Sequence, residues 1–143
     1  RKPDVILVDY LTLVKGGGED WQTAGAVAAG LKHIGAESGA SVVSAAQLNR
    51  EHGLSGGKDA PPGPEALAQS DGIGQVADVV LTLKNLSPSV SKMKLAKHRH
   101  GVSGQAFYCQ FQPGQGIFTE IKKQRAEELR EKDAELADTM EAD

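Results

Sequence analysis

Hydrophobic residues are unevenly spread along the chain, and the densest apolar run lies near its start. Residues 5–13 read Val-Ile-Leu-Val-Asp-Tyr-Leu-Thr-Leu. Four consecutive aliphatic residues without alternation predict a strand covered on both faces, as in a parallel sheet. Asp9 directly follows these residues, and parallel sheets bind ligands at the carboxyl ends of their strands. Asp9 is therefore a candidate Mg²⁺ ligand, and the alternative is that it caps a turn after a core strand.

A helix and a second strand are expected next. Residues 22–38 place Val27, Leu31 and Ile34 on one stripe, which predicts a helix. Residues 41–48, Ser-Val-Val-Ser-Ala-Ala-Gln-Leu, predict a second buried strand, so that strand, helix and strand form a right-handed parallel crossover. Gln47 ends this strand much as Asp9 ends the first. The alternative is that Gln47 is an ordinary polar residue at a strand end.

The remainder of the chain predicts short elements separated by glycine and proline. An antiparallel hairpin is expected to close the sheet, because two short strands flank Gln-Pro-Gly-Gln. In order, the expected elements are a long loop over 49–64, short helical turns over 64–69 and 70–77, strands over 79–83 and 93–97 with a turn between them, and the hairpin strands over 105–111 and 116–119.

Length and cysteine content narrow the class of protein. A chain of 143 residues is long enough for one domain with a single core. Cys109, the one cysteine, offers neither an intrachain disulfide nor a zinc cluster, which favours a reducing compartment. No apolar run approaches the roughly 18 residues of a membrane span. We therefore expect a soluble, cytoplasmic protein with no membrane partner.

Charge divides the chain into a body and a tail. The net charge is −3, but residues 120–143 contain nine acids and five bases, which leaves eleven bases and ten acids, a net of +1, for residues 1–119. We expect one domain over 1–119 and an acidic tail, helical or disordered, over 120–143. Because the body is nearly neutral, a nucleic-acid site would have to be a local groove, and it would need several subunits.

A basic cluster precedes a glycine in the second half of the body: Lys97-His98-Arg99-His100-Gly101. Near a subunit boundary, such a cluster presents cations to phosphate oxygens. The alternative is a solvated hairpin tip. Metal binding by His98 and His100 is less favoured, because no third ligand lies nearby in the sequence.

Four segments that contain these residues together resemble the second half of a RecA-type ATPase, most closely the DnaB-like replicative helicases and the phage primase-helicases. The resemblance covers about residues 4–119. It implies an α/β fold, the second half only of a RecA-like P-loop NTPase core, with a parallel sheet and a closing antiparallel hairpin. The segments are VILVDYLTLV (5–14), SVVSAAQLNRE (41–51), SDGIGQVADVVLTLKN (70–85) and KLAKHRHGVSGQAFYCQF (94–111).

The resemblance also implies roles for individual residues. Asp9 corresponds to the Walker-B aspartate that holds Mg²⁺ with ATP, and Gln47 to the polar sensor of the γ-phosphate. Lys97 and Arg99 correspond to the pair that reaches the neighbouring subunit's γ-phosphate, with Arg99 as the arginine finger. The loop over about 65–75 corresponds to the segment that contacts single-stranded DNA, here through Gln69, Ser70, Gly72 and Gly74. The implied partners are single-stranded DNA, the other subunits of a homo-hexamer, and primase or polymerase.

Two features depart from the family pattern. The position that is usually basic in the DNA loop is Ala68, which predicts weak DNA binding by the isolated chain. In addition, no G-x-x-x-x-G-K-[ST] motif occurs, and the catalytic glutamate upstream of Walker B is missing. We therefore expect that the isolated chain does not hydrolyse ATP, and that it is a fragment or one half of a split gene whose other half supplies the P-loop.

Two other functions are compatible with these residues. The first is a fragment of a RadA-like recombination protein or a clock-type ATPase of the same superfamily. The second is a catalytically dead module that docks on a complete helicase through the face bearing Arg99.

Overall fold

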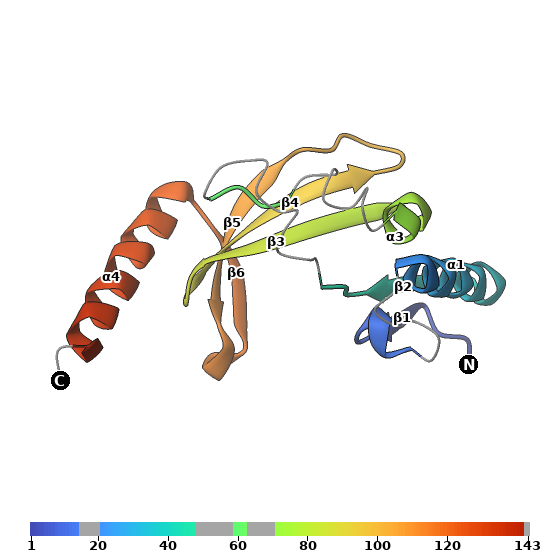
Figure 1. Ribbon diagram of the computed structural model, residues 1–143, viewed down its shortest axis with the longest axis horizontal. Helices are drawn as coiled ribbons and strands as arrows, with labels where there is room; N and C mark the ends of the chain where they lie inside the picture. Colours follow the sequence, from blue (N-terminus) through green and yellow to red (C-terminus); the bar gives the residue numbers. More distant parts are fainter. Residues whose placement is uncertain (15–20, 48–58, 63–70, 142–143) are drawn as a thin grey trace. The chain divides into compact units, whose positions relative to one another are not determined.

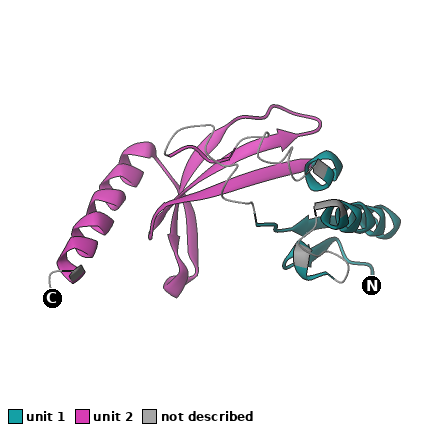
Figure 2. Cartoon of the chain, in the orientation of Figure 1, with its two compact units in different colours: residues 1–52, 64–78 teal, residues 53–63, 79–143 magenta. Residues whose placement is uncertain are grey.

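The computed structural model describes residues 1–14, 21–47, 59–62 and 71–141. The chain is α/β and divides into two compact units, shown in different colours in Figure 2. Unit 1 comprises residues 1–52 and 64–78, and unit 2 comprises residues 53–63 and 79–143. The sequence predicted one domain with a single core, whereas the contacts of the chain group into these two units.

Unit 1 is built on a pair of parallel strands joined by a helix (Figure 1). The two strands pair in register from Val5 opposite Ser41 to Val8 opposite Ser44. The predicted strand–helix–strand order is thus confirmed. The elements of this unit are β1 (Val5–Val8), the 3₁₀ turn η1 (Leu11–Leu13), α1 (Trp21–Ser38), β2 (Ser41–Ser44) and α3 (Asp71–Val76).

Helix α1 ends at Ser38, as the sequence predicted, and a glycine follows it. Gly39 has a left-handed φ of 70°, a conformation that a residue without a side chain adopts at little cost. The Ala40 N–H then donates a hydrogen bond of 3.0 Å to the Gly35 carbonyl. A Cβ on Gly35 would lie 2.9 Å from Val42 Cγ2, so the last turns of α1 pack closely against β2.

The predicted burial of the first strand on both faces is wrong. Strand β1 is shorter than expected, and Val5 and Leu7 are 52% and 76% exposed. Val43, the register partner of Leu7, is exposed as well. Because side chains alternate along a strand, Val42 faces α1 while Val43 faces the opposite way. Helix α1 thus covers one face of the strand pair and leaves an apolar face exposed in this chain.

Unit 2 contains a four-stranded sheet in the order β3-β4-β5-β6, antiparallel throughout. The predicted closing hairpin is confirmed as β5 and β6, where Phe111 and Phe118 face each other edge to face with ring centroids 6.0 Å apart. The elements of this unit are β3 (Val79–Ser87), β4 (Val90–His98), β5 (Ala106–Gln112), the 3₁₀ turn η3 (Pro113–Gln115), β6 (Ile117–Ile121) and α4 (Lys123–Glu141).

Among the described residues, parallel pairing is confined to β1 and β2. Strand β3 pairs with β4, to which Pro88 and Ser89 alone connect it. A connection of two residues joins only antiparallel strands, since a parallel pair needs a long crossover. The expected parallel-sheet core is therefore limited to one strand pair, and β3 and β4 are longer than predicted.

Helix α4 packs on the sheet through its first half. Ala126 and Leu129 are buried against Val90 of β4. Leu86, Tyr108 and Ile121 surround this cluster. The acidic tail, predicted as helical or disordered, is therefore helical over its described residues, and part of it belongs to the core of unit 2. No helix in the part of the chain that the structure describes is both long and apolar enough to span a membrane.

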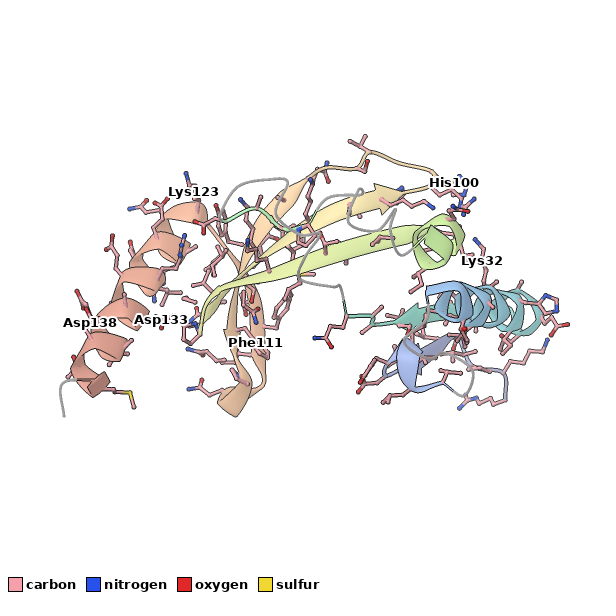
Figure 3. The ribbon with its side chains drawn as sticks, viewed as in Figure 1. Lys32, His100, Phe111, Lys123, Asp133 and Asp138 are labelled. Carbon is pink, nitrogen blue, oxygen red and sulfur yellow. The ribbon has the colours of Figure 1, made fainter. Side chains whose placement is uncertain are left out.

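Polar contacts fix the middle of α4. Asp133 accepts hydrogen bonds from the N–H of Ser89 at 3.0 Å and from its hydroxyl at 2.7 Å, at the turn between β3 and β4 (Figure 3). Arg130 forms an ion pair of 2.9 Å with Asp59. Partial burial acts to raise the pKa of Asp133, but the serine contacts outweigh it and lower this pKa. The Ser87 hydroxyl contributes to the lowered pKa as well, although its oxygen meets no geometric criterion for a hydrogen bond with another described residue.

The burial of Leu129 predicts a large loss of stability on truncation. Leu129→Ala should lower the free energy of unfolding by roughly 2–4 kcal/mol, because it removes buried methyl groups and leaves a cavity. Leu136, exposed on the same helix, is the matched control, and Leu136→Ala should stay within about 0.5 kcal/mol of the wild type. Urea denaturation followed by circular dichroism measures both. Equal effects of the two changes would contradict the docking of α4.

The lowered pKa of Asp133 predicts a pH-dependent contribution to stability. A carboxyl whose pKa is lower in the folded state stabilises the fold fully above its ordinary pKa of 3.8, and the contribution disappears as pH falls through the folded value. Asp133→Asn should therefore cost about 1 kcal/mol at pH 7, and the difference from the wild type should shrink below pH 3.8. Thermal denaturation across this range measures it. Asp138→Asn, at an exposed position of α4, is the control, and a difference from the wild type that stays constant with pH would refute the assignment.

Candidate functional site

The carboxyl edge of the β1–β2 pair forms a shallow depression. Its lining residues are Asp9, Tyr10, Ala45, Ala46 and Gln47, and its volume is about 320 Å³. The parallel register creates this arrangement, because both strands end at the same edge of the sheet.

Hydrogen bonds hold the two segments side by side beyond the strand ends. The Ser44 hydroxyl donates to the Val8 carbonyl at 2.9 Å, and the Leu11 N–H donates to the Ala45 carbonyl at 2.9 Å. Leu11 itself is buried, which anchors the segment that carries Asp9. These hydrogen bonds therefore fix the backbone around the depression, from which the side chains of Asp9 and Gln47 project.

The structure brings Asp9 and Gln47 together at this depression, as the sequence predicted. Both side chains are exposed. Strand β2 ends at Ser44, so Gln47 lies three residues beyond the strand and not at its end, as we had expected. A carboxylate beside a carboxamide suits a ligand with phosphate and a hard cation, since one binds Mg²⁺ and the other donates hydrogen bonds to oxygen.

The donor set fits a metal that arrives with a nucleotide. The described residues contain no group of three or more His, Cys, Asp or Glu side chains able to enclose an ion. Mg²⁺ is commonly held by one or two carboxylates, with waters and substrate phosphates completing its shell. Asp9 at an open edge provides a site of this kind, whereas a structural metal cage needs more ligands.

The predicted DNA loop is described only at its carboxyl end. Gln69 and Ser70 lie outside the described residues, as does most of the loop over 65–75. Gly72 and Gly74 lie in α3, which confirms the predicted short helix over 70–77 in its described part. This helix belongs to the same unit as Asp9 and Gln47.

The basic cluster lies in unit 2, where β4 ends and the chain turns towards β5. Lys97 is half-buried in β4 opposite Val80, and Arg99 is exposed in the turn. Backbone hydrogen bonds close this connection, from Gly104 N–H to the Leu95 carbonyl at 2.7 Å and from Leu95 N–H to the Gln105 carbonyl at 2.8 Å. Arg99 therefore extends from a constrained turn, not from a long loop.

His98 is a residue of this turn to which the sequence gave no separate role. Its Nδ1 is buried without a hydrogen-bond partner among the described residues, and its ring lies against Gly101. A Cβ on Gly101 would lie 2.6 Å from His98 Cε1 and closer still to Nδ1. In the sequence, only the glycine three residues after His98 could have indicated this contact. The folded turn shows that the imidazole ring occupies the space that a side chain at position 101 would need.

Cys109 lies in an environment that disfavours reaction of its thiol. The side chain is 1% exposed, and burial together with the nearby Glu120 raises the pKa of its thiol. A nucleophilic cysteine needs the opposite environment, one that is accessible and electropositive.

The chain was compared with curated protein sequences and with solved structures. No curated protein sequence matches the chain. Among solved structures, an ATPase domain matches with a TM-score of 0.67 and 23% identity, over 82% of this chain and 44% of that chain. The structure of a DnaB-like replicative helicase and its interactions with primase matches with a TM-score of 0.66 and 23% identity, over 82% of this chain and 31% of that chain.

These structures are similar to the chain in fold, which is the RecA-like α/β fold expected from the sequence. The chain spans less than half the length of either one. A family model described as the DnaB-like helicase C-terminal domain matches residues 1–120, which include the depression, α3 and the basic turn. The chain therefore belongs to the family of DnaB-like helicase C-terminal domains.

Proposed function

We propose that the chain is the γ-phosphate-sensing and subunit-interface part of a hexameric, ATP-driven replicative helicase that translocates on single-stranded DNA and unwinds duplex. The observation that carries the proposal is the position of Asp9 and Gln47 at one depression within a DnaB-like domain. The open carboxyl edge of a parallel strand pair is where nucleotide-binding folds of this class hold their ligand.

Asp9 and Gln47 have different roles at the nucleotide. Asp9 would hold a Mg²⁺ ion that arrives with the nucleotide, since a carboxylate is a hard anionic ligand, and the ion would supply positive charge next to the phosphates. Gln47 donates a hydrogen bond to an oxygen of the γ-phosphate. Transfer of the γ-phosphoryl group to water and release of the resulting phosphate would remove this acceptor, so the amide would report the state of the nucleotide to the rest of unit 1.

Lys97 and Arg99 serve the nucleotide of a neighbouring subunit. An arginine supplied from a second chain stabilises charge on the transferred phosphoryl group and adds about 10³ to 10⁵ in rate. Exposure of Arg99 on a constrained turn favours this role, because a finger must reach outward and keep its position. The resulting site is shared between subunits, which couples hydrolysis to assembly of the hexamer.

A P-loop must come from another segment, because these 143 residues contain no such motif. The apolar face of Val5, Leu7 and Val43 is suited to pack against that segment, since strands of this class are covered on both faces. We infer that this chain alone does not hydrolyse ATP. Single-stranded DNA, bound by the loop that ends in α3, and primase or polymerase are the further partners of the complete helicase.

The shared site predicts complementation between two inactive variants. In the complete protein that includes the P-loop segment, Arg99→Ala should bind nucleotide nearly as the wild type does but lose DNA-stimulated hydrolysis. Asp9→Ala should instead weaken Mg²⁺-nucleotide binding within its own subunit. A mixture of the two forms some interfaces with a wild-type Asp9 and a wild-type Arg99, so part of the ATPase activity should return. A phosphate-release assay on the variants, separately and mixed, measures this.

The results of the mixing experiment distinguish the proposed helicase function from its alternatives. Normal hydrolysis by Arg99→Ala would show that the basic turn is only a solvated hairpin tip. Absence of ATPase activity in the complete wild-type protein would instead favour a catalytically dead module that docks on a helicase.

The contact between His98 and Gly101 predicts a steric effect on the finger. Gly101→Ala places a methyl group where the imidazole lies, so we expect the ring to be displaced and the turn that carries Arg99 to shift with it. Displacement of a catalytic group by about 1 Å costs roughly 100-fold in rate. DNA-stimulated hydrolysis by the complete protein should fall by roughly this factor, with nucleotide affinity unchanged.

The double variant His98→Ala/Gly101→Ala tests the cause. Removal of the ring restores the space, so the double variant should regain most of the activity lost in Gly101→Ala. A further loss in the double variant would mean that His98 acts by another route.

A further inference from the structure

Two glycines of unit 1 bring helices α1 and α3 into backbone contact. A Cβ built on Gly25 of α1 would lie 2.7 Å from the Cα of Gly72 in α3, and a Cβ on Gly72 would collide with the Cα of Gly25. Both positions therefore admit only hydrogen in this packing. Gly72, one of the predicted DNA-contacting residues, is therefore also the residue through which α3 approaches the backbone of α1.

A lysine on the same helix holds the other end of α3. Lys32 Nζ donates to the Val76 carbonyl at 2.9 Å and to Asp78 Oδ1 at 2.7 Å, and Figure 3 shows its side chain on α1. Val76 is the last residue of α3, where carbonyls lack a partner within the helix. Lys32 follows Gly25 by seven residues, about two helical turns, so both contacts come from one face of α1.

Helix α3 depends on these contacts for its position. An isolated helix of six residues is unstable in water, because nucleation is costly and few hydrogen bonds follow it. Gly72 near its start and Val76 at its end are both held by α1. Helix α1 in turn follows η1, whose Leu11 is anchored to Ala45 beside the depression. Within the described part of unit 1, α1 therefore contacts both η1, which adjoins the depression, and α3.

We propose that Gly25 and Lys32 are positioning residues that hold the carboxyl end of the DNA-binding loop on α1. The proposal rests on the proposed function, in which this loop contacts single-stranded DNA. Neither residue touches nucleotide or DNA, and both act through α3. Loss of the contact between α1 and α3 should weaken the stimulation of ATPase activity by DNA. The rate of ATP hydrolysis in the absence of DNA should not change.

Helix α1 supplies a matched control for this proposal. A Cβ on Gly30 would have no atom within 4 Å, in contrast to Gly25. Gly25→Ala and Gly30→Ala therefore remove the same glycine flexibility from one helix, and only the first disturbs α3. Lys32→Met removes the charged group at a partly exposed position, so this variant should fold even if Gly25→Ala does not.

The experiment has two readouts. In this chain, hydrogen exchange of the amides over residues 71–78 should accelerate in Gly25→Ala and Lys32→Met and stay unchanged in Gly30→Ala. In the complete protein, the concentration of single-stranded DNA that gives half-maximal stimulation of ATPase should rise roughly tenfold in the first two variants. The DNA-independent rate and the KM for ATP should not change in either variant.

The outcomes separate the two proposals. If single-stranded DNA stimulates the wild type and all three variants equally, or exchange in α3 is unaffected by Gly25→Ala and Lys32→Met, the positioning role is wrong. A wild-type protein that shows no stimulation by DNA overturns the proposed function, and with it the role of α3 in DNA binding. In that case, faster hydrogen exchange of the α3 amides in Gly25→Ala and Lys32→Met would still show that contacts with α1 stabilise α3.

Discussion

Parallel pairing of β1 with β2 is the constraint on which the candidate nucleotide site depends. Parallel strands end at one edge, so two polar residues that are 38 positions apart, Asp9 and Gln47, come to line one depression. The pairing also requires a crossover, because the chain must return to the start of the sheet before β2 begins. Helix α1 meets that requirement and provides the surface on which α3 packs.

The two units position their functional groups by different physical means. In unit 1, backbone atoms of adjacent segments approach closely, as in the contact of Gly25 with Gly72 and the hydrogen bond from Leu11 to Ala45. In unit 2, backbone hydrogen bonds close the connection between β4 and β5 that carries Arg99, and α4 packs on the four-stranded antiparallel sheet. Both arrangements hold polar groups on short, constrained connections, which suits sites that must keep their geometry while ligands change.

Exposed apolar residues connect the fold with the proposed function. Val5, Leu7 and Val43 form an uncovered face on strands of a type that is normally covered on both faces. The chain also spans less than half the length of the solved structures that it resembles. In the proposed function, this apolar face is the surface that packs against the segment supplying the P-loop.

The sequence by itself determined the α/β class, the parallel crossover, the closing hairpin, and Asp9 and Gln47 as neighbours, because these follow from local periodicity and from residues at the ends of apolar runs. Burial was decided only by the tertiary structure. Leu129 and Leu136 lie on the same helix in similar charged surroundings, yet one is buried against Val90 and the other is exposed. The space beside Gly72 and Gly101 likewise depends on Gly25 and His98. Local propensity reflects the nearest neighbours in sequence, whereas burial and backbone approach depend on which distant segment packs against a residue.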